Sequence, residues 1–179
     1  ILLQAEARGV TLYSRLAALS EQHATQADTT QAVRLAGRWL AKLHALRSEP
    51  LRARSPIADA PGSLCVMRRH CAELAARFPA EAARIAQIAQ AILACLADSP
   101  DQPLVPTHGD FHPKNIYVAG ERVTVIDFDR FAYSQPARDL GYFMAQSMTM
   151  AYTATMHFQA SAAWNAQFMD SYVAEGRPP

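Results

Sequence analysis

Residues that can transfer protons and bind a metal ion are concentrated in one short part of the sequence. His108, Asp110 and Asn115 form the pattern H-G-D-x-x-x-x-N, and Asp127 lies near the end of the apolar segment that follows. That segment, IYVAGERVTVIDFD, predicts a β-hairpin with a turn at Ala119–Glu121. Because a hairpin brings the chain back beside its start, we expect Asn115 and Asp127 to face each other, with Asp110 on the loop just before.

This arrangement suits the transfer of a phosphoryl group from a nucleoside triphosphate. Magnesium bridges phosphate oxygens, prefers hard oxygen ligands and usually takes one or two carboxylates from a protein. Asn115 and Asp127 supply an amide oxygen and a carboxylate, while Asp110 can orient an acceptor hydroxyl and take its proton. The catalytic loop of protein kinases has the same H-x-D-x-x-x-x-N spacing, followed by a separate metal-binding aspartate.

A family resemblance extends over most of the chain. HGDFHPKN followed by VTVIDFD resembles the catalytic and metal loops of aminoglycoside phosphotransferases and their relatives, which include choline, homoserine and sugar kinases. Gly109 stands where protein kinases usually carry arginine, which favours the small-molecule kinases. Three further segments are similar to parts of this family, namely residues 2–12 to its hinge, 36–46 to its long C-lobe helix and 136–146 to the segment after the metal loop.

The resemblance implies roles for individual residues. Asp110 would be the catalytic base, and Asn115 and Asp127 would be the magnesium ligands. Backbone groups of Ala5 and Ala7, in the hinge, would hydrogen-bond the adenine edge. The implied reaction is Mg²⁺-dependent transfer of the γ-phosphate of ATP or GTP to a hydroxyl of a small molecule.

The fold that the resemblance implies is α+β and mostly helical, the C-terminal lobe of a protein-kinase-like fold with a small β-hairpin carrying the catalytic and metal loops. Residues 1–10 are expected to form a hinge segment to an N-terminal lobe, and residues 11–179 the helical C-terminal lobe. The chain begins at Ile1 and contains no G-x-G-x-x-G or V-A-I-K-like segment of such a lobe. We therefore expect weak or no kinase activity from these 179 residues alone, and self-association through apolar surface near the hinge.

Apolar residues at helical spacing and the positions of proline predict the other elements. Thr29 or Thr30 is expected to cap a long helix, and the polar stretch before it to be a loop. Residues 49–62, which hold three prolines, are expected to be mostly irregular, and Pro79 is expected in the first turn of the helix that follows it. The expected helices span residues 11–19, 29–46, 63–78, 80–96, 136–150 and 157–173.

Bulk composition indicates an ordinary globular chain. Half of the residues are hydrophobic and the formal net charge is +1, so neither nucleic acid nor an anionic membrane is favoured as a partner. No stretch approaches the roughly 20 apolar residues that span a bilayer, and no signal peptide is recognised. The three cysteines form no C-x-x-C pair, and we expect them to be thiols in the reducing cytoplasm.

Several other polar residues near the motif are assigned mainly structural roles. We expect His108 to brace its loop through hydrogen bonds, and Asp139 to cap a helix or tie down the catalytic loop. His112 can approach the transferred phosphate or lie exposed, and Asp129 can touch a second metal or lie at the surface. Lys114 is expected to be a solvated surface lysine.

Two other functions are weighed against the kinase. GDFH contains the G-D-x-H string of metallophosphoesterases, but the remaining histidines do not form the clusters that a two-metal site needs. The chain can also be an isolated or degenerate kinase lobe that acts as a non-catalytic binding module, although the intact Asp110, Asn115 and Asp127 argue against degeneration.

The acceptor is only weakly constrained by the sequence. The helices over residues 63–97 carry arginines as well as acidic residues and show no acidic pocket, which favours a neutral or anionic hydroxyl substrate over a polycationic aminoglycoside. Trp164 is either a packing residue or part of the acceptor pocket, and His44 is expected in the core.

Overall fold

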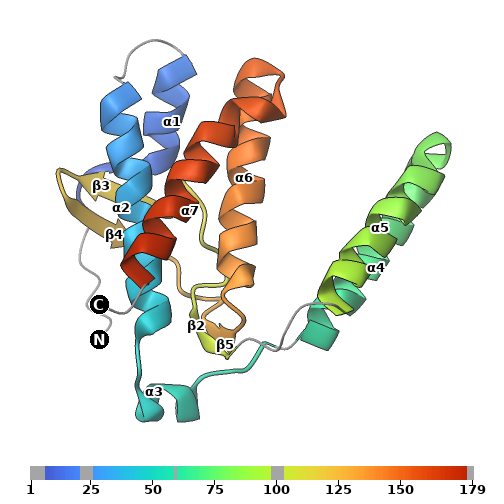
Figure 1. Cartoon of the computed structure of the whole chain (residues 1–179), viewed down its shortest axis with the longest axis horizontal. Helices are drawn as coiled ribbons and strands as arrows, with labels where there is room; N and C mark the ends of the chain where they lie inside the picture. The colour runs from blue at the N-terminus through green and yellow to red at the C-terminus, as the bar shows by residue number, and fades with distance from the viewer. Residues whose placement is uncertain (1–6, 21–25, 59, 98–102, 177–179) are drawn as a thin grey trace. The chain divides into compact units, whose positions relative to one another are not determined.

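The computed structural model describes residues 7–20, 26–58, 60–97 and 103–176. It divides the chain into two units, the first comprising Ile1–Pro56 and Leu104–Pro179 and the second Ile57–Pro103. The first unit holds the loop with Asp110 and the hairpin before Asp127, and the second interrupts it in sequence (Figure 1).

Helices make up most of the first unit, and all of them except the short α3 bury apolar residues. The long helix α2 begins at Gln26, so Thr29 is buried inside it and does not cap it as expected. Asp28 in its first turn favours this earlier start, because a carboxylate stabilises a helix N-terminus. The helices of this unit are α1 (Leu12–Ser20), α2 (Gln26–Ala45), α3 (Glu49–Arg54), α6 (Ala137–Thr155) and α7 (Ala162–Gly176), with the 3₁₀ turn η2 (Phe158–Ser161) before α7.

Helix α3 corrects the expectation that residues 49–62 are mostly irregular. Pro50 lies in its first turn, where the missing N–H of proline would have no helical partner in any case. The hydroxyl oxygen of Ser48 accepts a hydrogen bond from the amide of Leu51 and caps the helix. The prolines therefore mark a helix start here, and the capping serine was the signal that the sequence analysis did not use.

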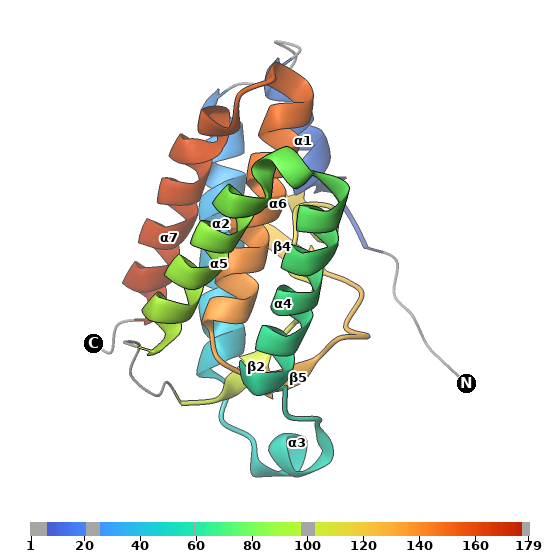
Figure 2. The ribbon, with the colours of Figure 1, turned by 90° about the vertical axis from the view of Figure 1, so that its right-hand side faces the viewer.

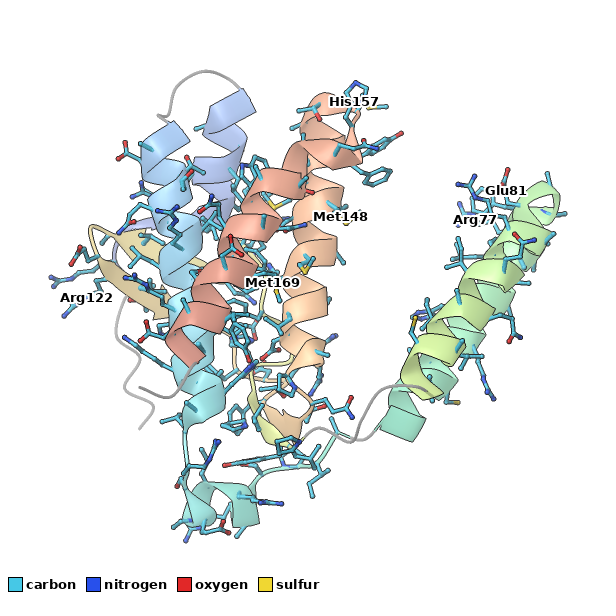
Figure 3. All side chains as sticks on the ribbon, viewed as in Figure 1. Arg77, Glu81, Arg122, Met148, His157 and Met169 are labelled. Atoms are coloured by element: carbon cyan, nitrogen blue, oxygen red, sulfur yellow. The ribbon has the colours of Figure 1, made fainter. Side chains whose placement is uncertain are left out.

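Two small antiparallel sheets complete the first unit. The expected hairpin is confirmed, because β3 pairs with β4 with Ile116 opposite Val125, and Figure 3 shows Arg122 near its turn pointing away from the helices. The other strands were not expected, since two or three residues are too few to show alternation. The strands are β1 (Val10–Thr11), β2 (Val105–Thr107), β3 (Ile116–Ala119), β4 (Arg122–Val125) and β5 (Ala132–Ser134), paired in the orders β1-β3-β4 and β2-β5.

The core of the first unit is continuous with the loop after β2. Helices α2 and α7 lie side by side (Figure 1), and a Cβ atom added to Gly37 would meet the carbonyl oxygen of Phe168 at 2.5 Å. Phe168 stacks on Phe143 of α6 with ring centroids 3.9 Å apart. Phe111, from the loop, packs against both rings. The loop that carries Asp110 is therefore anchored in the helical core by an aromatic side chain.

The second unit is a helical hairpin, as the sequence predicted (Figure 2). Helices α4 (Ala60–Arg77) and α5 (Ala82–Ala97) are joined by the 3₁₀ turn η1 (Pro79–Glu81), and Arg77 and Glu81 mark this end of the hairpin in Figure 3. Pro79 thus opens the turn that leads into α5. Among the described residues, no helix is both long and apolar enough to cross a bilayer.

The approach of α2 to α7 gives a prediction about stability. Gly37→Ala is expected to lower the free energy of unfolding by about 1–3 kcal/mol, because α7 must move to admit a methyl group. Gly141→Ala in α6 is the matched control; nothing lies within 4 Å of its added Cβ, so we expect a gain of about 0.5–1 kcal/mol. Urea unfolding followed by circular dichroism measures the free energy of unfolding of both variants. Equal changes in the two variants would contradict close packing at Gly37.

Candidate active site

Two loops meet at the ends of the two sheets. The HGD loop, residues 108–115, connects β2 to β3, and the DFD loop, residues 126–131, connects β4 to β5. Because β3 pairs with β4 and β2 pairs with β5, both ends of one loop lie next to the ends of the other. The topology therefore brings Asp110 and Asp127 to the same place from separate parts of the chain.

Asn115 connects the two loops through hydrogen bonds. Its backbone oxygen accepts a hydrogen bond from the amide of Ile126 at 3.1 Å, which places Asp127 next to it across the hairpin. Its side-chain Nδ2 donates to the carbonyl oxygen of Asp110 at 3.1 Å. Within the part of the chain that the structure describes, this leaves Oδ1 of Asn115 without a donor, in a residue that is only 7% exposed. An amide oxygen oriented in this way can coordinate a metal cation.

Asp127 has a left-handed backbone conformation, with φ of 68°. Few residues other than glycine adopt it, and aspartate is among those that tolerate it best. Backbone strain of this kind gathers at functional sites. The strain falls where β4 ends, so the exposed carboxylate of Asp127 follows directly on the hairpin pair formed with Asn115.

Gly109 is required by the close contact between the two loops. Its φ is 81°, and an added Cβ would overlap the carbonyl oxygen of Arg130 in the DFD loop and lie 2.9 Å from the guanidinium of Arg138. No larger side chain fits without separating the loops. The glycine that distinguishes this sequence from protein kinases therefore has a steric reason in this structure.

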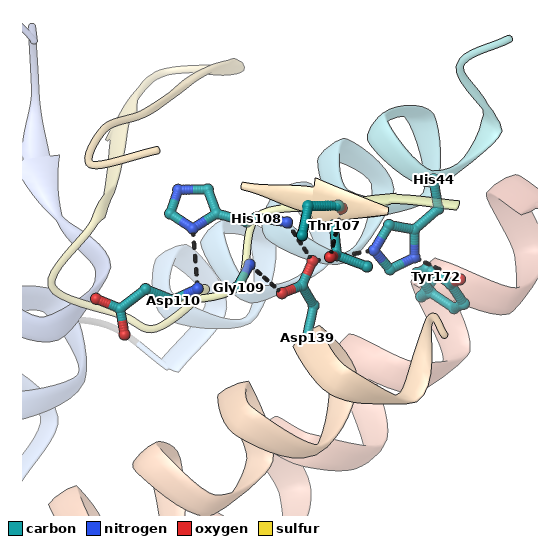
Figure 4. A network of polar contacts seen from close by, with 8 residues as sticks. His44, Thr107, His108, Gly109, Asp110, Asp139 and Tyr172 are labelled. Carbon is teal, nitrogen blue, oxygen red and sulfur yellow. Dashed lines mark hydrogen bonds and ion pairs between the residues drawn. The ribbon is translucent and has the colours of Figure 1, made fainter. Parts of the chain in front are cut away.

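A buried carboxylate on α6 holds the HGD loop in place (Figure 4). Asp139 is 0% exposed, and its two oxygens accept hydrogen bonds from the backbone amides of His108 and Gly109, each at 2.7 Å. Nε2 of His44 donates to the same carboxylate at 3.1 Å. Of the two roles that the sequence left open for Asp139, tying down the loop is confirmed. In Figure 4 the Asp110 side chain points away from this network.

His44 extends the network to the last helix. While Nε2 faces Asp139, Nδ1 of the same ring is hydrogen-bonded to the hydroxyl of Tyr172 in α7 at 2.9 Å. Burial and the charge of Asp139 both raise the pKa of Tyr172, which keeps the hydroxyl protonated. His44 is 4% exposed, as expected for a core residue, and it joins three helices to the loop.

His108 braces both loops, which confirms its expected structural role. Its Nε2 donates to the carbonyl oxygen of Ile126 at 2.9 Å, and its Nδ1 accepts from the amide of Asp110 at 3.2 Å. This pattern requires the neutral imidazole with hydrogen on Nε2. Burial lowers the pKa of His108, against the opposing effects of the Ile126 carbonyl and nearby carboxylates, and so favours the neutral form.

The charges of the two aspartates act on the same histidines. Asp110 and Asp127 both influence the titration of His108 and of His112. Nε2 of His112 lies 3.7 Å from Oδ2 of Asp110, and its ring meets that of Tyr142 edge-on with centroids 6.0 Å apart. Burial lowers the pKa of His112 overall, so the ring is neutral at pH 7.

Tyr142 was missed by the sequence analysis. Burial raises its pKa, and a hydrogen bond with Asp110 and the charge of that carboxylate raise it further. Its position three residues after Asp139 on α6 points it toward the HGD loop, but only the packing of the helix reveals this. The polar groups around Asp110 thus include one from a segment that carries no recognisable motif.

The predicted site residues fall into two groups. Asp110, Asn115 and Asp127 are brought together by the two loops. Ala5 lies outside the described residues, while Ala7 is half-buried just before β1, and its expected contact with adenine stays a prediction. The sequence left the roles of three other residues undecided. In the structure Asp129 and Lys114 are exposed, and Trp164 is partly buried and lines a cavity.

The donor set fits magnesium better than a two-metal hydrolytic centre. Asn115 and Asp127 offer an amide oxygen and a carboxylate, the hard ligands that magnesium takes from proteins. Among the described residues, no group of three or more His, Cys, Asp or Glu side chains is arranged to hold a metal ion. The histidine-rich cluster that the metallophosphoesterase alternative requires is therefore not found in that part of the chain.

Comparison with known proteins identifies the family. The phosphotransferase enzyme family matches residues 2–178, so the chain belongs to this family. A search of curated proteins finds no significant match. The mostly helical α+β fold corresponds to the C-terminal portion of kinase-like structures of this family, as expected.

Solved structures show the same fold. A glucosamine kinase matches with 25% identity and a TM-score of 0.69, over 92% of this chain and 45% of the kinase. A macrolide 2'-phosphotransferase from Brachybacterium faecium is 28% identical over 84% of this chain and 46% of its own, with a TM-score of 0.51. A choline/ethanolamine kinase family protein from Mesorhizobium loti, 20% identical, shares the fold with a TM-score of 0.62 over 98% of this chain and 51% of its own. The chain thus spans about half the length of these proteins.

The buried carboxylate gives a prediction about stability. Asp139→Asn is expected to lower the free energy of unfolding by about 2–4 kcal/mol, because an amide group cannot accept from both loop amides and from His44. Asp170→Asn, at an exposed position on α7, is the control and should change it by less than about 0.5 kcal/mol. Thermal and urea unfolding compare the two, and similar losses would show that the network does not hold the loop.

The neutral His108 gives a prediction about pH. Below its ordinary pKa of 6.5 the unfolded chain binds a proton at this residue while the folded chain does not. Stability should therefore fall as the pH drops from 6.5 toward the lowered pKa, by up to about 1.4 kcal/mol per pH unit. His108→Gln cannot titrate, so its unfolding free energy should fall less between pH 7.5 and 5.5. An identical pH dependence in both proteins would contradict the prediction.

Proposed function

We propose that this protein transfers the γ-phosphate of ATP or GTP to a hydroxyl of a small molecule in a Mg²⁺-dependent reaction. The observation that carries the proposal is the convergence of Asp110, Asn115 and Asp127 on two loops that are hydrogen-bonded to each other. Membership of the phosphotransferase enzyme family supports it.

Asn115 and Asp127 are proposed to hold the metal ion. Oδ1 of Asn115 is oriented by the bond from Nδ2 to Asp110, so the amide oxygen is presented without a competing donor among the described residues. When bound, magnesium neutralises the charge of the phosphate oxygens. The left-handed backbone of Asp127 fixes where its carboxylate leaves the hairpin, so the two ligands do not need to be ordered at each turnover.

Asp110 is proposed to be the catalytic base. Its carboxylate accepts the proton of the acceptor hydroxyl as that oxygen bonds to the γ-phosphorus. The bond between the γ-phosphorus and the β–γ bridging oxygen breaks, and the nucleoside diphosphate leaves with the electron pair. The backbone of Asp110 is fixed by His108 and Asn115, which leaves its side chain to orient the hydroxyl.

The nucleotide base is proposed to bind at the hinge. Residues 1–10 are assigned as the hinge segment, with backbone groups of Ala5 and Ala7 on the adenine edge, and residues 11–179 as the C-terminal lobe. A glucosamine kinase with this fold has been crystallised with glucosamine, ADP and inorganic phosphate, which supports both a nucleotide and a small-molecule acceptor. Because the chain spans about half of such proteins, we expect little activity from it alone.

The proposal is tested by nucleoside diphosphate release with Mg²⁺ in the full-length natural protein. Sugars, choline, homoserine and aminoglycosides serve as acceptors. We expect acceptor-dependent release, and Asp110→Asn should reduce it about 10²–10⁴-fold because the base is lost. Asp170→Asn is the control with the same change of charge on an exposed helix position, and it should leave the rate unchanged.

A second variant separates metal binding from proton transfer. Asp127→Asn should raise the Mg²⁺ concentration needed for half-maximal rate, whereas Asp110→Asn should lower the rate at saturating Mg²⁺. Tight nucleotide binding without release for any acceptor would instead favour a non-catalytic binding module. No Mg²⁺-nucleotide binding would overturn the kinase itself.

A further inference from the structure

A cavity opens beside the HGD loop on the side of α1 and α6. Its volume is about 220 Å³, and its lining includes Tyr13 from α1, His112 and Lys114 from the loop, and Gln146 and Thr149 from α6. The loop is fixed here, because the carbonyl oxygen of Pro113 accepts from the amide of Tyr13 at 3.0 Å. The cavity is therefore built from three elements and does not depend on one flexible side chain.

One lining residue of the cavity lies next to the proposed catalytic carboxylate. His112 is part of its wall, and Nε2 of the same ring lies 3.7 Å from Oδ2 of Asp110. Gln146, also in the wall, interacts with Tyr142, which in turn bonds to Asp110. A molecule whose hydroxyl lies at Asp110 can thus extend past His112 into the cavity.

Among the described residues that line this cavity, Lys114 is the one with a full charge at neutral pH. No aspartate or glutamate is among the described residues that line this cavity or its neighbour, and burial lowers the pKa of His112, which favours the neutral ring. Nζ of Lys114 lies 4.9 Å from the ring centroid of Tyr13, which holds the ammonium group over the aromatic face. Within the described residues, no carboxylate lies at salt-bridge distance from Lys114. The ammonium group is therefore available to an anion.

The neighbouring cavity provides room for a carbon skeleton. Its volume is about 350 Å³, and it shares Tyr13, Met150 and Thr153 with the first. Its other lining residues are apolar and include Leu16 and Trp164. Trp164, which the sequence left between packing and an acceptor pocket, thus lines a cavity adjacent to the polar one.

We propose that this polar cavity binds the end of the acceptor remote from the hydroxyl that is phosphorylated. This end carries a carboxylate, and the ammonium group of Lys114 binds it and so determines specificity. The inference rests on the proposed function for the position of the hydroxyl. It adds a substrate class, hydroxyl compounds with an anionic group, and a residue that determines specificity. A polycationic acceptor would place positive charge against the ammonium group, and no carboxylate among the described lining residues would offset it.

Matched probes that differ only in charge test this inference. Glucose, glucuronate and glucosamine form one set, and butane-1,4-diol, 4-hydroxybutyrate and 4-aminobutan-1-ol form a second with a short skeleton. Binding of each probe is measured by saturation-transfer NMR on full-length Asp110→Asn protein with Mg²⁺-nucleotide, and turnover is measured on the wild type. The anionic member of at least one set should bind about tenfold more tightly than the neutral one, and the cationic member least.

Variants of Lys114 supply the control. Lys114→Glu should reverse the order of binding affinities within the set, so that the cationic probe binds most tightly. Lys114→Arg should keep the wild-type order, because arginine retains the charge. Lys114 is exposed, so neither change is expected to affect folding. The inference is overturned if no anionic probe binds, if the cationic probe binds most tightly, or if Lys114→Glu leaves the order unchanged. If the order holds but no probe is phosphorylated, the cavity assignment stands and the proposed reaction fails.

Discussion

The arrangement of both loops depends on one buried carboxylate. Asp139 is removed from water, which is costly for a charge unless hydrogen bonds replace the lost solvent. Two backbone amides and a histidine do so, and charge-assisted bonds of this kind are roughly twice as strong as neutral ones. Because two of these donors belong to consecutive residues of the HGD loop, the carboxylate fixes the direction in which the chain passes Asp110.

The same restraint is transmitted to the second loop. His108, whose amide is held by Asp139, bonds through its ring to the carbonyl of Ile126, immediately before Asp127. Gly109 allows the DFD loop to lie against the HGD loop without a side chain between them. The proposed base and metal ligands thus stand on loops that are bound to a helical core through Asp139 and Phe111. Such support is what precise placement of reacting groups requires.

The sequence predicted the parts of this structure that depend on local spacing. The hairpin and the proposed site residues follow from short patterns, because strand alternation and the H-G-D-x-x-x-x-N motif are read along the chain. Tyr142 could not be found this way, since its contact with Asp110 depends on how α6 packs. The strands β1, β2 and β5 exist only as pairs, and no single segment of two or three residues carries their signal. The early start of α2, with Asp28 in its first turn, and the helix α3, capped by Ser48, were misjudged because these local signals outweighed the polar and proline-rich composition.

The two segments of the first unit that flank the second unit in sequence meet at one strand. The amide of Tyr133 in β5 donates to the carbonyl oxygen of Pro56 at 2.8 Å, and Val105, just after the unit, pairs with Ser134 of β5. The chain therefore leaves the first unit and returns to it at two adjacent points of one anchored strand. A segment inserted between such points can change in length or composition without shifting the strands that carry the loops. The helical hairpin can thus vary in length and sequence while the two loops that carry the proposed site residues stay in place.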